Sequence, residues 1–108
     1  MELLDLNGLR LYRFPRLSAF PEVVHGVFTR QGGVSREPYR SLNVSLAVGD
    51  LPSKVKENLR LVQQTLNLDR LVSATQVHGC NEAVIQAGYV LPPGEIPEVD
   101  ILITAQPG

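Results

Sequence analysis

The sequence has few of the features that mark secreted, membrane-spanning or nucleic-acid-binding proteins. Its single cysteine, Cys80, excludes an internal disulfide and is typical of a reducing cytosolic environment. Ten basic and eleven acidic residues are scattered along the chain, without the basic stripe of a nucleic-acid surface. No apolar run approaches the ~20 residues of a membrane span, and the N-terminus lacks a basic region followed by an apolar one. We therefore expect a cytoplasmic protein with neither a membrane nor a nucleic acid as partner.

What is present is the composition of an ordinary globular domain. The hydrophobic fraction is 44% and the charged fraction is 19%. A length of 108 residues is near the lower size at which a chain builds its own core. We therefore expect residues 1–108 to form one domain at most.

Most of the chain is expected to form β-strands. Asn7-Gly8 lies between two apolar runs and favours the tight turn of a β-hairpin over residues 3–14. Residues 41–48 alternate between apolar and polar side chains, which is typical of a strand with one buried face. Further strands are expected over residues 23–29, 71–77, 82–91 and 100–104.

One segment has the spacing of a helix. Apolar side chains recur at helical spacing from Val55 to Leu66 and predict a helix over about residues 53–66. Asp50 or Ser53 is the expected N-cap, and Asn58 is expected to make a structural hydrogen bond. The expected fold class is therefore α+β (mixed α/β), with a mixed β-sheet of about five or six strands and one main helix.

A single helix is too little to cover both faces of such a sheet. We therefore expect the chain to be the N-terminal part of a longer domain, in which other segments complete the core. In the chain alone, the strand over residues 100–104 and the apolar side of the helix should be partly exposed. Self-association through the sheet edge is then a possibility.

Two histidines and the cysteine are candidates for metal binding or nucleophilic catalysis. His78 follows a predicted strand, where an imidazole can point into a cleft and bind zinc; a surface or capping histidine is the commoner case. Cys80 lies two residues further on, so a Cys80–His78 nucleophilic pair is an alternative to a small residue in a loop. His25 lies in an apolar segment and is expected to be held by packing and one hydrogen bond.

Polar residues around a Gly-Gly turn are candidates for binding an anion or a nucleoside. Arg30 precedes Gly32-Gly33 and could hold a phosphate beside exposed backbone amides, with a solvated arginine in a turn as the alternative. Asn43 could bind a base or ribose, or it could bridge backbone groups of its own turn. Gln76 is expected to lie behind the residues that contact the reacting groups, without contacting those groups itself.

Six short segments occur in a specific order and spacing. They are HGVFTRQGGVS, PYRSLN, VGD, VKEN, QVHG and VDILITAQPG. Together they resemble the N-terminal half of the YfiH-like family, once called multicopper polyphenol oxidases or laccase-domain proteins. The resemblance covers about Val24 to Gly108. The departures are modest: Ser45 stands where glycine is usual, and Val99 where alanine is usual.

The resemblance implies a zinc-dependent purine nucleoside phosphorylase with adenosine deaminase activity. It implies that His78 is a metal ligand, that copper is possible in place of zinc, and that the remaining ligands lie outside this chain. Arg30 and Asn43 would be catalytic residues, with Arg30 holding the phosphate. The substrate-binding residues would be Gly32, Gly33 and Gln76. The expected partners are a purine nucleoside and phosphate, and the 108-residue chain alone is expected to be inactive.

Two other hypotheses stay open from the sequence. The chain could be a small non-enzymatic module that binds a nucleoside without a metal. It could also be a hydrolase that uses Cys80 and His78 and is contained within 108 residues.

Overall fold

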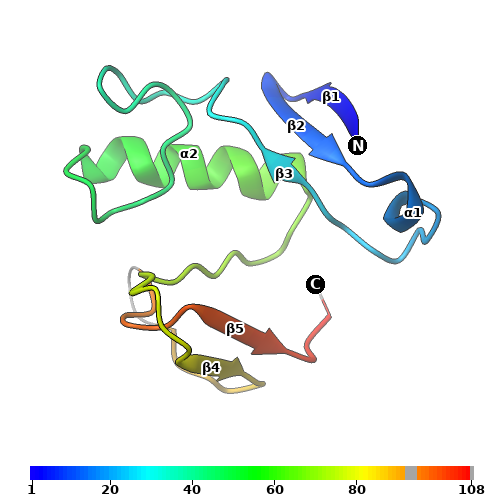
Figure 1. The fold of residues 1–108 in the computed structure, drawn as a ribbon, viewed down its shortest axis with the longest axis vertical. Coiled ribbons are helices and arrows are strands. Elements are labelled where there is room, and N and C mark those ends of the chain that lie inside the picture. The colour runs from blue at the N-terminus through cyan, green and yellow to red at the C-terminus, as the bar shows by residue number, and fades with distance from the viewer. Residues whose placement is uncertain (92–94, 108) are drawn as a thin grey trace. The chain divides into compact units, whose positions relative to one another are not determined.

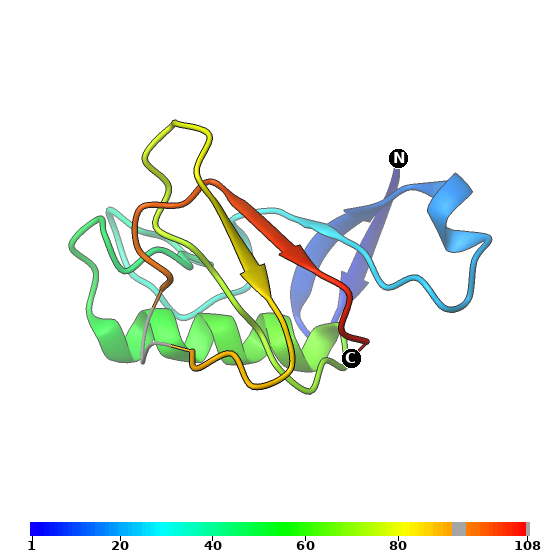
Figure 2. The same cartoon turned by 90° about the horizontal axis from the view of Figure 1, so that it is seen from below.

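A computed structural model describes residues 1–91 and 95–107 (Figure 1, Figure 2). The chain forms two compact units, Met1–Leu68 and Asp69–Gly108, and each is described by itself. Helices and strands occur together in the described residues, which is compatible with the expected α+β class. No helix in the described residues is long and apolar enough to cross a membrane. One domain over the whole chain stays a prediction.

The first unit contains a three-stranded antiparallel sheet. Its strands are β1 (Glu2–Leu6), β2 (Leu9–Arg13) and β3 (Val27–Phe28), and they are paired in that order. The predicted hairpin is confirmed. Asn7 and Gly8 form its turn with φ of 53° and 77°, a left-handed backbone that Asn-Gly adopts readily.

Two helices belong to the same unit, the short α1 (Pro15–Ser18) and the longer α2 (Pro52–Thr65). The helix predicted over residues 53–66 is therefore confirmed to within one residue at each end. Val55 and Asn58 on α2 are fully buried, as are two leucines of β2. The core of this unit thus lies where the helix packs against the sheet.

The start of α2 differs from the predicted capping. Leu51 is the N-cap residue, rather than Asp50 or Ser53, and no side-chain hydrogen bond from the described residues caps the helix. Pro52 occupies the first turn, where an N–H would have no partner within the helix. Asp50 accepts the main-chain N–H of Leu51 at 2.8 Å, and its other carboxylate oxygen faces the preceding loop.

The strand predicted over residues 41–48 is wrong, because this segment is a loop. Hydrogen bonds from side chains to nearby backbone N–H groups take the place of the backbone hydrogen bonds between paired strands. Asn43 Oδ1 accepts the Ser45 N–H at 3.1 Å, and Ser45 Oγ accepts the Ala47 N–H at 3.2 Å. Asn and Ser side chains often compete with strand pairing in this way. The alternation does not create a buried face, since Val48 is 52% exposed.

The second unit contains a two-stranded parallel sheet of β4 (Glu82–Ile85) and β5 (Ile101–Thr104). The last predicted strand is thus confirmed, whereas the strand predicted over residues 82–91 ends after four residues. The strand predicted over 71–77 is reduced to an isolated parallel bridge between Ala74 and Ile96.

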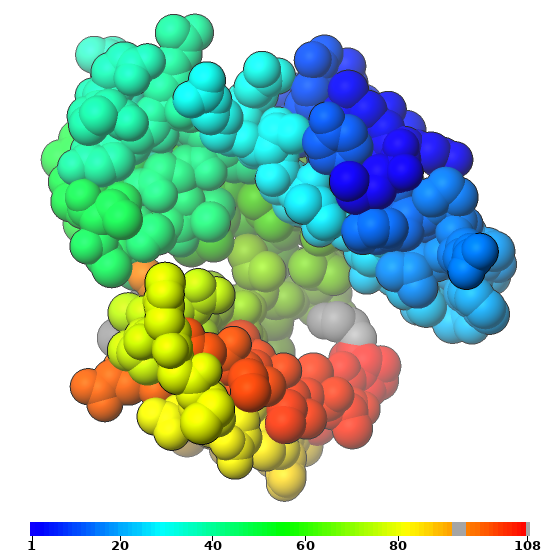
Figure 3. Space-filling view, viewed as in Figure 1, coloured from blue at the N-terminus to red at the C-terminus, as the bar shows by residue number. Residues whose placement is uncertain are grey.

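The described residues therefore form two small sheets, of three and two strands, rather than one sheet of five or six. The segment predicted as a strand over 23–29 contributes to this difference, because within the described residues the strand β3 covers only Val27–Phe28. In the space-filling view, the loop between β3 and α2 forms a continuous surface in cyan and green (Figure 3). This loop holds most of the candidate site.

Every residue of β5 is exposed, as expected for the strand over residues 100–104. Ile101, Leu102 and Ile103 are 44%, 39% and 49% exposed. The expectation for the helix is met only in part: Val55 is fully buried, whereas Leu59 further along the same stripe is partly exposed.

Candidate functional site

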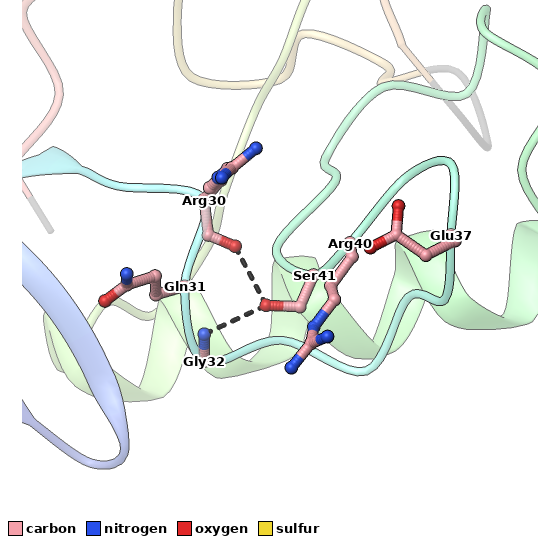
Figure 4. A pocket seen from close by; sticks show the side chains of 6 residues that line it. All are labelled: Arg30, Gln31, Gly32, Glu37, Arg40 and Ser41. Atoms are coloured by element: carbon pink, nitrogen blue, oxygen red, sulfur yellow. Dashed lines mark hydrogen bonds between the residues drawn. The ribbon is translucent and has the colours of Figure 1, made fainter.

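A polar cavity of about 480 Å³ lies in the loop between β3 and α2 (Figure 4). It is lined by Arg30, Gln31, Gly32, Glu37, Arg40 and Ser41. Two residues predicted for the site, Arg30 and Gly32, are thus brought to one cavity. The other lining residues were missed, although they lie in or beside two of the motifs, TRQGGVS and PYRSLN.

Hydrogen bonds to one carbonyl close this loop. The Arg30 carbonyl accepts the N–H of Ser41 at 2.9 Å, the N–H of Leu42 at 2.8 Å and the Ser41 hydroxyl at 2.9 Å. The Ser41 hydroxyl oxygen also accepts the Gly32 N–H at 3.1 Å (Figure 4). The backbones on either side of the cavity are therefore tied to each other.

The two glycines of the turn are required by the chain's own packing. A Cβ on Gly32, which has φ +100°, would lie 2.2 Å from the Gly8 carbonyl oxygen. A Cβ on Gly33 would lie 2.2 Å from the Ser41 carbonyl oxygen and 2.5 Å from Asn58 Oδ1. Gly32 lines the cavity, whereas Gly33 packs beside the buried part of α2. The close backbone contacts at both glycines therefore serve the folding of this loop.

Arg30 and Arg40 bring two unpartnered cations to the cavity. Within the described residues, neither guanidinium forms a hydrogen bond or an ion pair. Their side chains extend to different sides of the Ser41 hydroxyl in Figure 4, and Glu37 supplies the one carboxylate of the lining. Two arginines and one glutamate leave the lining with a formal charge of +1.

Asn58 fixes this loop onto α2 from the buried side. Its Oδ1 accepts the Val34 N–H at 2.8 Å, and its Nδ2 donates to Ser35 Oγ at 2.8 Å and to the Asn43 carbonyl at 2.7 Å. The side chain is 0% exposed, and all its polar atoms have partners. The structural hydrogen bond expected of Asn58 is confirmed.

Asp50 is the charged member of the same network. Ser35 Oγ donates to Asp50 Oδ2 at 2.5 Å, and Asn43 Nδ2 donates to the same oxygen at 3.2 Å. The Ser35 hydroxyl, followed by the Asn43 amide and the Leu51 N–H, lowers the pKa of the Asp50 carboxyl. The Asn43 side chain thus bridges groups of its own loop, one of the two roles inferred for it.

His78 and Gln76 belong to the second unit, and both are exposed. His78 has φ 61°, and the N–H groups of Val77, His78 and Gly79 all donate to the carboxylate of Asp100. The Gly79 N–H contributes most to lowering the pKa of that carboxyl, followed by the other two. Sequence reasoning missed Asp100, whose only local signal is its place directly before an apolar strand.

Neither the thiol pair nor a complete metal site is formed by the described residues. No hydrogen bond joins the exposed Cys80 to His78 in this part of the chain. Residues 1–91 and 95–107 also contain no group of three or more His, Cys, Asp or Glu side chains that could hold a metal ion. His25 is held as expected: its Nε2 accepts the Phe14 N–H at 2.9 Å, and its ring stacks on Phe14.

Comparison with known proteins identifies the family. A sequence profile described as multi-copper polyphenol oxidoreductase laccase matches residues 24–108. The chain belongs to this family. The YfiH-like resemblance of the ordered motifs is thereby confirmed.

Three curated relatives are named purine nucleoside phosphorylases. The protein of Streptomyces coelicolor is 42% identical over 85 residues, which cover 77% of this chain and 34% of the relative. That of Bacteroides thetaiotaomicron is 32% identical over 106 residues, covering 92% and 39%. That of Deinococcus radiodurans is 38% identical over 103 residues, covering 94% and 36%. The chain thus spans about a third of the length of the curated relatives it matches.

Proposed function

We propose that this chain is the N-terminal part of a purine nucleoside phosphorylase. The observation that carries the proposal is its likeness to relatives of that name over 77% to 94% of its length. The polar cavity supports it, because phosphorolysis needs an anion beside the sugar and Arg30 offers there a guanidinium that has no partner in residues 1–91 and 95–107. The proposed location of the protein in the cell is the cytoplasm. The proposed substrates are a purine nucleoside, such as adenosine or inosine, and phosphate.

Phosphorolysis assigns clear tasks to the chain's residues. A phosphate oxygen attacks C1′ of the ribose while the N-glycosidic bond breaks, and the bonding electron pair leaves with the purine, which takes up a proton. Arg30 would hold the phosphate against C1′. Asn43 is proposed to support the reacting groups from the loop. The proposed substrate-binding residues are Gly32, Gly33 and Gln76.

Zinc is proposed from the resemblance, with copper as the alternative metal. The described residues do not fit a complete zinc site, since a catalytic zinc usually has three protein ligands and no group of three or more His, Cys, Asp or Glu side chains lies together among them. We propose that His78 supplies one ligand and that the others lie outside residues 1–108. Adenosine deaminase activity is likewise proposed from the resemblance to the YfiH-like family, and it would use the same metal.

A non-enzymatic nucleoside-binding module is the second candidate function. The observation that favours it is the polar cavity, because all the residues that line it belong to the first unit of this chain. The Cys80–His78 hydrolase is less well supported, because a nucleophile and its base need a hydrogen bond that the described residues do not form.

The test is a base-release assay on the natural-length gene product and the 108-residue chain. Each is incubated with adenosine or inosine and zinc, with and without phosphate, and the free base is followed by chromatography. We expect phosphate-dependent base release from the natural-length product, its loss in His78→Ala, and full activity in Cys80→Ala. Base release without phosphate, or its loss in Cys80→Ala alone, would favour a hydrolase. Nucleoside binding without turnover would favour the binding module.

A further inference from the structure

The cavity in the first unit is lined by polar and charged residues and by one glycine, so its chemistry restricts which ligands it can bind. Its six residues include neither an aliphatic nor an aromatic side chain. Ligand sites for flat rings are mostly apolar or aromatic, with only a few polar groups. A purine base is therefore poorly matched to this lining, whereas a small polar and anionic group is well matched.

The charges of the lining point to an oxyanion. Arg30 and Arg40 both carry guanidinium groups without partners in the described residues. A guanidinium presents a rigid set of donors that fits a phosphate, and it stays charged at all physiological pH values. With Glu37 as the one carboxylate, the lining keeps a formal charge of +1, which favours an anion.

The arginines are attached to a backbone that is already closed. Ser41 follows Arg40 directly, and its N–H and hydroxyl both bind the Arg30 carbonyl at 2.9 Å. Asn58 holds the same loop against α2 from its buried side. The attachment points of both side chains are thus fixed before a ligand binds, which lowers the entropic cost of binding.

We propose that this cavity is a phosphate subsite in which Arg40 is the second cationic residue beside Arg30. The inference rests on the proposed function and names its subsite: inorganic phosphate binds here, as does the phosphate group of the pentose 1-phosphate that phosphorolysis forms. Glu37 accepts hydrogen bonds from the sugar hydroxyls. The purine base binds outside this cavity.

The experiment is a titration of the 108-residue chain at low ionic strength, followed by isothermal calorimetry and amide NMR shifts. The probes are inorganic phosphate, ribose 1-phosphate and adenine. Arg30→Ala and Arg40→Ala are compared with Arg36→Ala, because Arg36 is an exposed arginine of the same loop that does not line the cavity. Amide NMR spectra of each variant show whether its fold is retained.

We expect each cavity variant to weaken phosphate binding roughly tenfold or more, as loss of a charge-assisted hydrogen bond does. Arg36→Ala should change the affinity less than twofold, and adenine should leave the loop signals unshifted. Glu37→Gln should strengthen inorganic phosphate binding and weaken that of ribose 1-phosphate. Equal losses in Arg36→Ala and Arg40→Ala, or no phosphate binding to the wild-type chain, would overturn the inference.

A second readout separates this inference from the proposed function. If the natural-length product performs phosphorolysis and Arg40→Ala leaves its KM for phosphate unchanged, the subsite is wrong and the function stands. If Arg30 and Arg40 are needed for phosphate binding but no base is released, the subsite stands and the function is wrong.

Discussion

The carboxylate of Asp100 holds the backbone of His78 in a left-handed conformation. Asp100 Oδ1 accepts the His78 N–H at 2.9 Å and the Val77 N–H at 3.0 Å, while Oδ2 accepts the Gly79 N–H at 2.7 Å. His78 has φ 61°, which an L-residue other than glycine seldom adopts without support. The conformation at the proposed metal ligand is therefore set by a residue 22 positions away.

Removing the Asp100 carboxylate should free the three amides that it binds. In Asp100→Ala, amide hydrogen exchange at Val77, His78 and Gly79 should become roughly tenfold faster, because each N–H loses a charged acceptor. Asp100→Asn retains an oxygen in place of Oδ1, but its NH₂ cannot accept, so the increase should be largest at Gly79. Unchanged exchange in Asp100→Ala would contradict the role given to this carboxylate.

Asp50 should make the stability of the first unit fall at acid pH. The Ser35 hydroxyl, then the Asn43 amide, hold the pKa of this carboxyl below its usual value of about 3.9. The ionised carboxylate therefore contributes fully to the free energy of unfolding at a pH above that usual pKa. This contribution is lost as the pH falls through the lower pKa of the folded state. Asp50→Asn should therefore flatten the acid limb of a plot of unfolding midpoint against pH. Glu22→Gln, which changes an exposed carboxylate of the same unit, should leave that limb as in the wild type.

Asn58 should be the most sensitive polar position of α2. Asn58→Ala leaves the Val34 N–H and the Asn43 carbonyl without their partner in a buried site, and we expect it to lower the free energy of unfolding by about 3 kcal/mol. Gln64→Ala, on an exposed position of the same helix, should change it by less than about 0.5 kcal/mol. Urea denaturation measures both, and similar midpoints for the two variants would refute the network.

A methyl group at Gly33 should distort the loop that carries the cavity. In Gly33→Ala, the Cβ would meet the Ser41 carbonyl oxygen at 2.2 Å, so the backbone must shift, at a cost of about 1–3 kcal/mol. Gly79→Ala is the matched control, because its Cβ would meet only ordinary contacts, 3.6 Å or more away. Equal thermal stability of the two variants would show that the loop can yield at Gly33.

The elements that sequence alone predicts well are those whose cause is local. Asn7-Gly8 specifies its own turn, and the apolar stripe of α2 repeats within one segment. The strand over 41–48 failed because a periodic pattern says nothing of hydrogen-bond partners. There, the Asn43 and Ser45 side chains bind nearby backbone groups in place of a ladder.

The candidate site shows the same difference between features with a local signal and features that depend on distant parts of the chain. Arg30 and Gly32 were predicted because they lie in the TRQGGVS motif, which resembles that of the family; the Gly-Gly pair alone is a weak signal. Arg40 was missed, because its place at the cavity depends on Ser41 closing a loop across eleven positions to Arg30. Asp100 was missed for a related reason, since its partners lie 21 to 23 positions earlier. Contacts between distant segments depend on the folded chain, and a single sequence does not display them.

The small sheet of the second unit should make the chain associate with itself. Parallel strands are normally covered on both faces, yet every residue of β5 is exposed and Val84 on β4 is 45% exposed. An apolar strand with a free edge is a template for pairing with another copy. We expect size-exclusion chromatography with light scattering to give a mass that rises with protein concentration.

A charge on this strand should abolish the association. Ile103→Lys, at a position 49% exposed on β5, should remain monomeric because like charges would meet at the new edge. Val90→Lys adds the same charge at a position 88% exposed outside the strands, and it should associate as the wild type does. If the wild-type chain is monomeric at every concentration, the exposed sheet is not a self-association surface. If Val90→Lys is as monomeric as Ile103→Lys, net charge rather than the β5 surface governs the association.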